Sequence, residues 1–121
     1  MARILVIDDD EQLRRMLCLA LGREGYVVVE AGDGNEGLHQ LREAPVDLII
    51  TDLLMPEKEG LETIMDIRRE FPDVKIIAMS GGGQARNLNF LRVAERLGAQ
   101  RTMSKPFHIH ALLAVVQELL Q

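Results

Sequence analysis

Short runs of consecutive apolar residues recur along the chain, and most of them stop abruptly at a polar side chain. The clearest runs lie within residues 4–7, 26–29, 47–51 and 74–79. A strand that is covered on both faces in a parallel sheet carries a continuous apolar run rather than an alternating one. We therefore predict four buried strands at these positions. A fifth and less apolar strand is expected over 100–104, where the alternation with helices requires one.

The segments between the runs carry apolar residues three and four positions apart, which is the spacing of one helix face. In the first and last helices these positions are Leu13, Met16, Leu17, Ala20 and Leu21, and Ile109, Leu112, Leu113, Val116, Leu119 and Leu120. In the middle of the chain they are Leu38 and Leu41, then Leu61, Ile64, Met65 and Phe71, then Leu88, Phe90, Leu91 and Ala94. The tripeptide Asp33-Gly34-Asn35 is typical of a turn.

Five strand–helix pairs with short connections predict an α/β fold in three layers, with a five-stranded parallel sheet between helices on both faces. Right-handed crossovers bring the C-terminal ends of all the strands to the same edge of the sheet. Ligands of such doubly wound sheets bind at that edge, where the strand order reverses. A length of 121 residues suits one core. We expect residues 1–121 to form a single domain without an output domain.

Composition and charge argue against several classes of protein. The net charge is −5 and no basic stripe is visible, so nucleic-acid binding is not expected. The single Cys18 excludes an internal disulfide framework and a cysteine-rich zinc site. No apolar run approaches the roughly 20 residues that span a bilayer, and the N-terminus lacks a signal-peptide pattern. We therefore expect a cytoplasmic protein without a membrane contact.

Polar residues stand where the predicted strands end, and their chemistry suits phosphoryl transfer. Asp8 and Asp9 follow the first strand, Asp52 follows the third, Ser80 the fourth and Lys105 the fifth. Three neighbouring carboxylates stay ionised together only with a cation among them, and hard oxygen ligands suit Mg²⁺. The lysine and the hydroxyl would stabilise the charge of a transferring phosphoryl group. Asp52 is then the predicted nucleophile, which would form an aspartyl phosphate.

The same residues carry a resemblance to the receiver domains of two-component response regulators, and this resemblance covers essentially the whole chain. The matching motifs are Val6-Ile7-Asp8-Asp9, Thr51-Asp52-Leu53-Leu54-Met55-Pro56 with Gly60, Ala78-Met79-Ser80, and Ser104-Lys105-Pro106-Phe107. Each motif alone is weak, but four in order, each at a predicted strand end, are specific. The resemblance implies a flavodoxin-like sheet with the strand order 2-1-3-4-5.

The resemblance also implies a signalling cycle. Asp52 would accept a phosphoryl group from the phosphohistidine of a sensor histidine kinase or a phosphotransfer protein. The domain would catalyse its own phosphorylation and dephosphorylation, but it would act primarily as a switch for a downstream protein or output domain.

For the metal, the resemblance implies that Asp9 and Asp52 ligate Mg²⁺ directly, together with the main-chain carbonyl of Leu54. Asp8 would act mainly through water. Lys105 would pair with the phosphoryl group, and Ser80 would move to bond it. The Lys105–Pro106 peptide bond is expected to be cis.

One position departs from the family pattern in a way that bears on signalling. Thr102 stands where receivers usually carry an aromatic residue three positions before the lysine. The usual coupling of a serine to that aromatic ring therefore cannot operate in its ordinary form. We expect the glycine run 81–83 to transmit the signal instead, by becoming ordered when the phosphoryl group binds.

Two other functions remain open from the sequence. A small phosphatase resembling the haloacid-dehalogenase group would use Asp8 as its nucleophile, with Asp10 two residues later. The threonine that this group requires does not follow at the expected place, and Asp10 is better suited to cap a helix than to act as a ligand. The third possibility is a receiver that is never phosphorylated and serves only for docking. Phosphorylation of Asp52 separates the receiver from both alternatives.

Overall fold

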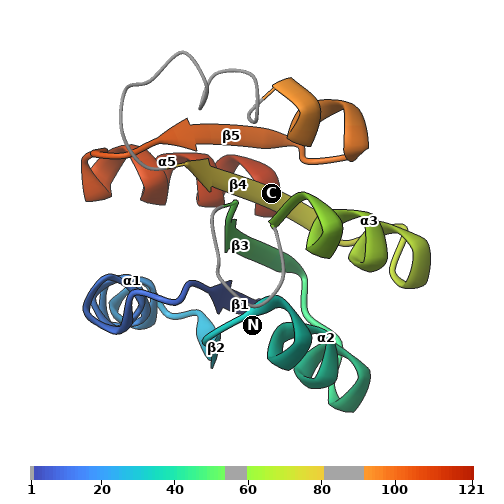
Figure 1. The fold of residues 1–121 in the computed structure, drawn as a ribbon. Helices are drawn as coiled ribbons and strands as arrows, with labels where there is room; N and C mark the ends of the chain where they lie inside the picture. The colour runs from blue at the N-terminus through green and yellow to red at the C-terminus, as the bar shows by residue number, and fades with distance from the viewer. Residues whose placement is uncertain (1, 54–59, 81–91) are drawn as a thin grey trace.

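The computed structural model describes residues 2–53, 60–80 and 92–121 (Figure 1). The strands are β1 (Arg3–Ile7), β2 (Val27–Ala31), β3 (Leu48–Asp52), β4 (Lys75–Ser80) and β5 (Arg101–Ser104). The helices are α1 (Glu11–Arg23), α2 (Gly34–Glu43), α3 (Gly60–Glu70) and α5 (Ile109–Leu120), and residues 92–97 are also helical. All pairings between strands are parallel, and the strand order is β2-β1-β3-β4-β5. The predicted fold class and strand order are both confirmed.

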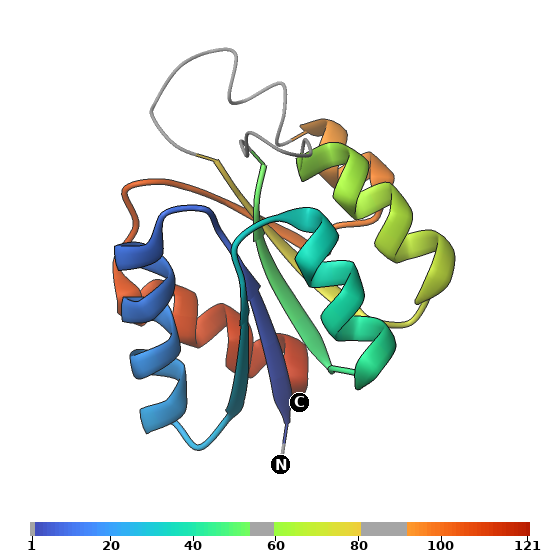
Figure 2. The ribbon, with the colours of Figure 1, turned by 60° about the horizontal axis from the view of Figure 1, so that its bottom comes forward.

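The sheet separates two hydrophobic layers, as expected for strands that are buried on both faces. On one face α2, α3 and residues 92–97 cover a layer that includes Leu5, Ile7 and Ile49. On the other face α1 and α5 cover a layer that includes Ile4 and Val6. Figure 2 shows this three-layer arrangement, with α1 and α5 on the side of the sheet opposite to α2 and α3. No helix among the described residues is both long and apolar enough to cross a membrane.

Helix α2 begins where the sequence indicated a turn. Asp33 is the N-cap of this helix, and its carboxylate accepts a hydrogen bond from the main-chain nitrogen of Glu36 at 2.8 Å. Gly34 is already the first helical residue. The predicted turn over 33–35 is therefore wrong. The physical reason is that short polar side chains which favour turns are also the preferred N-caps of helices.

Two methionines that we expected to face the core lie at its margin. The relative exposures of Met16 in α1 and Met65 in α3 are both 48%. Ile64 and Ile67 carry the burial of α3, while Phe71 follows the helix and is only half-buried. The buried stripe of a helix is narrow. Residues at the border of that stripe satisfy the sequence pattern without being covered.

Candidate functional site

The C-terminal ends of β1, β3, β4 and β5 meet at one edge of the sheet because the strands are parallel and in register. Thr51 of β3 pairs with Ile7 of β1 and with Ala78 of β4. Ser80 of β4 pairs with Ser104 of β5. Asp52 and Ser80 are the last residues of β3 and β4, and Asp8 and Lys105 directly follow β1 and β5, with Asp9 one position after Asp8. The expected gathering of Asp8, Asp9, Asp52, Ser80 and Lys105 at this edge is observed.

Three carboxylates form a compact cluster at the ends of β1 and β3. Asp8, Asp9 and Asp52 each offer one carboxylate oxygen, and these oxygens all lie within 4.8 Å of one another. Asp8 and Asp52 are buried, whereas Asp9 is exposed. Ligand atoms around an octahedral Mg²⁺ ion lie about 3–4 Å apart, so small side-chain adjustments would seat such an ion. The donor set, which consists of hard anionic oxygens, therefore fits Mg²⁺.

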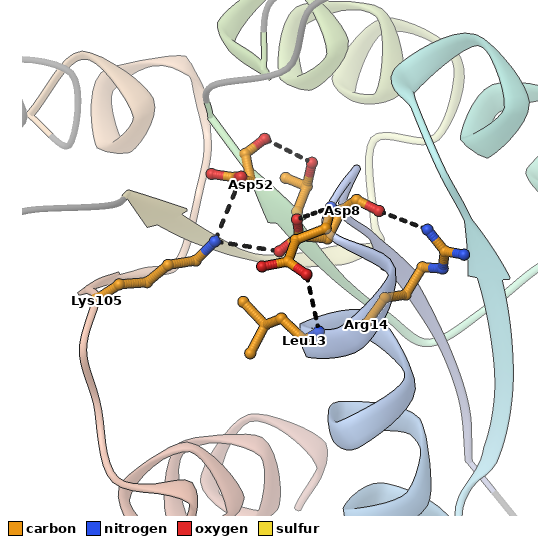
Figure 3. Close-up of polar contacts among 7 residues, drawn as sticks. Asp8, Leu13, Arg14, Asp52 and Lys105 are labelled. Atoms are coloured by element: carbon orange, nitrogen blue, oxygen red, sulfur yellow. Dashed lines mark hydrogen bonds and ion pairs between the residues drawn. The ribbon is translucent and has the colours of Figure 1, made fainter.

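The side chain of Lys105 extends from the segment after β5 and contacts two of these carboxylates (Figure 3). Its Nζ lies 3.2 Å from Asp8 Oδ2 and 3.4 Å from Asp52 Oδ2. Burial acts most strongly on the pKa of this ammonium group and lowers it. The charges and hydrogen bonds of Asp52 and Asp8 outweigh burial, so the pKa is raised overall. Lys105 is therefore a permanent positive charge in the site.

The main chain holds Lys105 in place. Its nitrogen donates a hydrogen bond of 2.7 Å to the main-chain oxygen of Ser80, which continues the pairing of β5 with β4. The Lys105–Pro106 peptide bond is cis, as expected.

The Ser80 hydroxyl is buried at the end of β4. Within the part of the chain that the structure describes, its oxygen has no hydrogen-bond partner. A buried hydroxyl normally finds a partner, and one without a partner marks either a cost to stability or a place for a ligand. Ser80 ends β4, which lies between β3, the strand that carries Asp52, and β5, the strand that leads to Lys105.

Arg14 reaches the acidic turn after β1, although no sequence motif had pointed to it. Its Nη1 donates a hydrogen bond of 2.9 Å to the main-chain oxygen of Asp8. Its Nε donates to Glu30 Oε1, also at 2.9 Å. No local pattern marks a residue on the polar side of a helix that folds back onto a neighbouring turn. Leu54, the remaining predicted metal ligand, and the glycine run 81–83 lie outside the described residues.

Comparisons with known proteins point to one protein family. A model of the response regulator receiver domain family matches residues 4–117. The response regulator receiver protein CpdR of Brucella abortus is 36% identical over 120 residues, which is 99% of this chain and 98% of CpdR. The DNA-binding transcriptional regulator NtrC of Azospirillum brasilense is 39% identical over 119 residues. This chain spans only 24% of that regulator's length, so it matches one part of a longer protein.

Solved structures show the same fold. The receiver domain of NtrX from Brucella abortus superposes with a TM-score of 0.90 at 27% identity, covering 97% of both chains. The chemotaxis protein CheY4 of Vibrio cholerae superposes with a TM-score of 0.88 at 29% identity, covering 98% of both chains. Together with the family match over most of the chain, these similarities show that this chain belongs to the response-regulator receiver domains of two-component systems.

Proposed function

We propose that this domain is a phosphoacceptor switch in which Asp52 takes a phosphoryl group from the phosphohistidine of a sensor histidine kinase or a phosphotransfer protein. The modified domain then acts on a downstream protein or output domain. The observation that carries the proposal is the position of Lys105, whose amino group bridges Asp8 and Asp52 beside a third carboxylate. A lysine inside an acidic cluster supplies the positive charge that a transferring phosphoryl group needs.

In the transfer, a carboxylate oxygen of Asp52 attacks phosphorus and forms a new phosphorus–oxygen bond. The phosphorus–nitrogen bond to the donor histidine breaks, and the imidazole leaves with the bonding electrons and takes a proton from solvent. The amino group of Lys105 moves from the Asp52 carboxylate to the arriving phosphoryl oxygens. The Ser80 hydroxyl donates a hydrogen bond to one of these oxygens. Position and charge are the main sources of catalysis in such a loose transition state.

Asp8, Asp9 and Asp52 would hold Mg²⁺, and the family resemblance adds the main-chain carbonyl of Leu54. When bound, the ion would neutralise negative charge on the phosphoryl oxygens and help to orient the donor. The carboxylate cluster itself supports this assignment, because its oxygens lie close together while two of its residues are buried. Buried like charges of this kind favour cation binding.

Intact mass spectrometry after incubation with Mg²⁺ and acetyl phosphate tests the proposal on the wild type, Asp52→Ala and Asp8→Ala. We expect a gain of one phosphoryl mass in the wild type that requires Mg²⁺ and is absent from Asp52→Ala. Labelling of Asp52→Ala together with loss of labelling in Asp8→Ala would assign the nucleophile to Asp8 and favour the phosphatase. Absence of labelling in the wild type would favour the docking module.

A further inference from the structure

Arg14 bridges the acidic turn after β1 to the edge strand β2 without belonging to the carboxylate cluster. Figure 3 shows its contact with Asp8. One nitrogen of its guanidinium group donates to the main-chain oxygen of Asp8, and another donates to the carboxylate of Glu30. The relative exposure of the Arg14 side chain is only 16%. A planar guanidinium group can make both hydrogen bonds at once, in fixed directions.

The hydrogen bond from Arg14 to the main-chain oxygen of Asp8 satisfies a buried acceptor. Asp8 is completely buried, and a buried main-chain carbonyl needs a donor. The nitrogen of Asp8 already donates to Ala31 at 3.1 Å, and its side-chain Oδ1 accepts from the nitrogen of Asp10 at 2.9 Å. Arg14 provides the donor for the remaining main-chain group and thereby ties the turn to α1.

We propose that Arg14, itself oriented by Glu30, is a positioning residue that holds the main chain of the Asp8–Asp9 turn in the geometry that binds a divalent cation. This inference rests on the proposed function and deepens it. Arg14 acts by fixing the main chain of Asp8. The carboxylates of Asp8 and Asp9 are then held close to that of Asp52. Partners that orient metal ligands in this indirect way commonly change metal affinity by about 10–100-fold when they are removed.

The direction in which Mg²⁺ affinity changes when Arg14 is removed distinguishes a positioning role from a purely electrostatic one. The hydrogen bond from Arg14 to Glu30 raises the pKa of the guanidinium group, so Arg14 remains charged. A positive charge beside a cation site repels the cation. If charge alone mattered, its removal would tighten Mg²⁺ binding. If Arg14 positions the turn, its removal weakens Mg²⁺ binding in spite of the lost repulsion.

Isothermal titration of the full chain with Mg²⁺, without a phosphodonor, tests this inference on Arg14→Met. We expect the Kd to rise by about 10–100-fold. Arg15→Met is the matched control, because Arg15 is the next residue of α1, is 68% exposed and pairs with Glu11. It removes the same charge from the same helix and should leave the Kd unchanged. A Kd for Arg14→Met that is equal to that of Arg15→Met, or tighter, would overturn the inference.

Glu30→Ala provides a second variant at the less buried end of the pair. It should weaken Mg²⁺ binding less than Arg14→Met does. It should have no further effect when Arg14 is already methionine, since coupled residues give non-additive changes. Thermal unfolding in EDTA reports the stability of each variant separately. A lower Tm with unchanged Mg²⁺ affinity in Glu30→Ala would make the pair merely structural and overturn the inference, whereas a wild type that does not bind Mg²⁺ would overturn the proposed function itself.

Discussion

The amino group of Lys105 lies 3.4 Å from the carboxylate of Asp52, although the two residues are 53 positions apart in the chain. The same amino group lies 3.2 Å from Asp8. One lysine therefore offsets the repulsion between two buried carboxylates when no cation is bound. If Mg²⁺ binds as proposed, the ion and Lys105 would both neutralise this cluster, so the effect of removing one should depend on the other.

Lys105→Met should slow the labelling of Asp52 by acetyl phosphate by roughly 10²–10³-fold, because the positive charge that stabilises the transition state is lost. It should also lower the Tm in EDTA and enlarge the gain in Tm that Mg²⁺ produces. The loss of stability should stay below the roughly 3–5 kcal/mol of a fully buried pair, since Lys105 retains 21% exposure. Lys75→Met, at the opposite end of β4, removes the same charge and should leave the labelling rate unchanged.

Two adjacent aspartates should differ in their effect on the response to Mg²⁺. Asp9→Asn removes one charge from the carboxylate cluster and should abolish most of the rise in Tm that Mg²⁺ causes in the wild type. Asp10→Asn should preserve that rise, because the Asp10 side chain accepts a hydrogen bond from the nitrogen of Leu13 and caps α1. Asparagine is an equally good N-cap. Thermal scans with and without Mg²⁺ measure both responses, and equal losses would contradict the separate roles.

Gly60 should not tolerate alanine. A Cβ at this position would lie 2.3 Å from the Cα of Leu53 and 2.6 Å from the main-chain oxygen of Asp52. The start of α3 would have to move away from the end of β3, so we expect Gly60→Ala to cost about 1–3 kcal/mol and to slow Asp52 labelling. Gly22→Ala is the matched control. It lies within α1, its Cβ would meet nothing within 4 Å, and it should stabilise the protein by about 0.5–1 kcal/mol. Urea unfolding measures both.

Ser80→Ala should separate stability from function. Because the hydroxyl is buried and has no partner among the described residues, its loss should leave the Tm unchanged or raise it. The rate of Asp52 labelling should fall, since a donor to the phosphoryl group is removed. Labelling at the wild-type rate would show that Ser80 does not contact the phosphoryl group.

Cys18 should react slowly with alkylating reagents in the folded protein. Burial, reinforced by the charge of Glu30 and only partly opposed by Arg14, raises the pKa of its thiol from 9.0 to about 11. At pH 8 the thiolate population is then about 100-fold lower than in the unfolded chain. The rate of iodoacetamide labelling, compared between native and urea-unfolded protein, tests this difference.

The same pKa shift links Cys18 to the stability of the fold. The folded state retains the thiol proton that the unfolded state loses first, so the contribution to stability is complete below pH 9. It is lost as the pH rises from 9.0 toward 11. Cys18→Ser should make the free energy of unfolding less sensitive to pH in that window, which urea titrations at several pH values would detect.

The sequence predicted the strands well because continuous apolar runs are a strong signal of burial on both faces. It was less accurate where burial depends on what covers an element. Met16 and Met65 have helical spacing, yet both are half-exposed. Strand β2 continues through Glu30 to Ala31, beyond the apolar run, because an edge strand tolerates a charged residue.

By itself, the sequence determined which side chains stand at the ends of the strands, because strand periodicity and right-handed crossovers are local or general rules. Only the tertiary structure decided how close those side chains come. The bridge from Lys105 to Asp8 and Asp52, and the hydrogen bond from Arg14 to the main chain of Asp8, join distant segments. Their distances depend on the register of the sheet and on the packing of α1 against it, and no local pattern of residues encodes either.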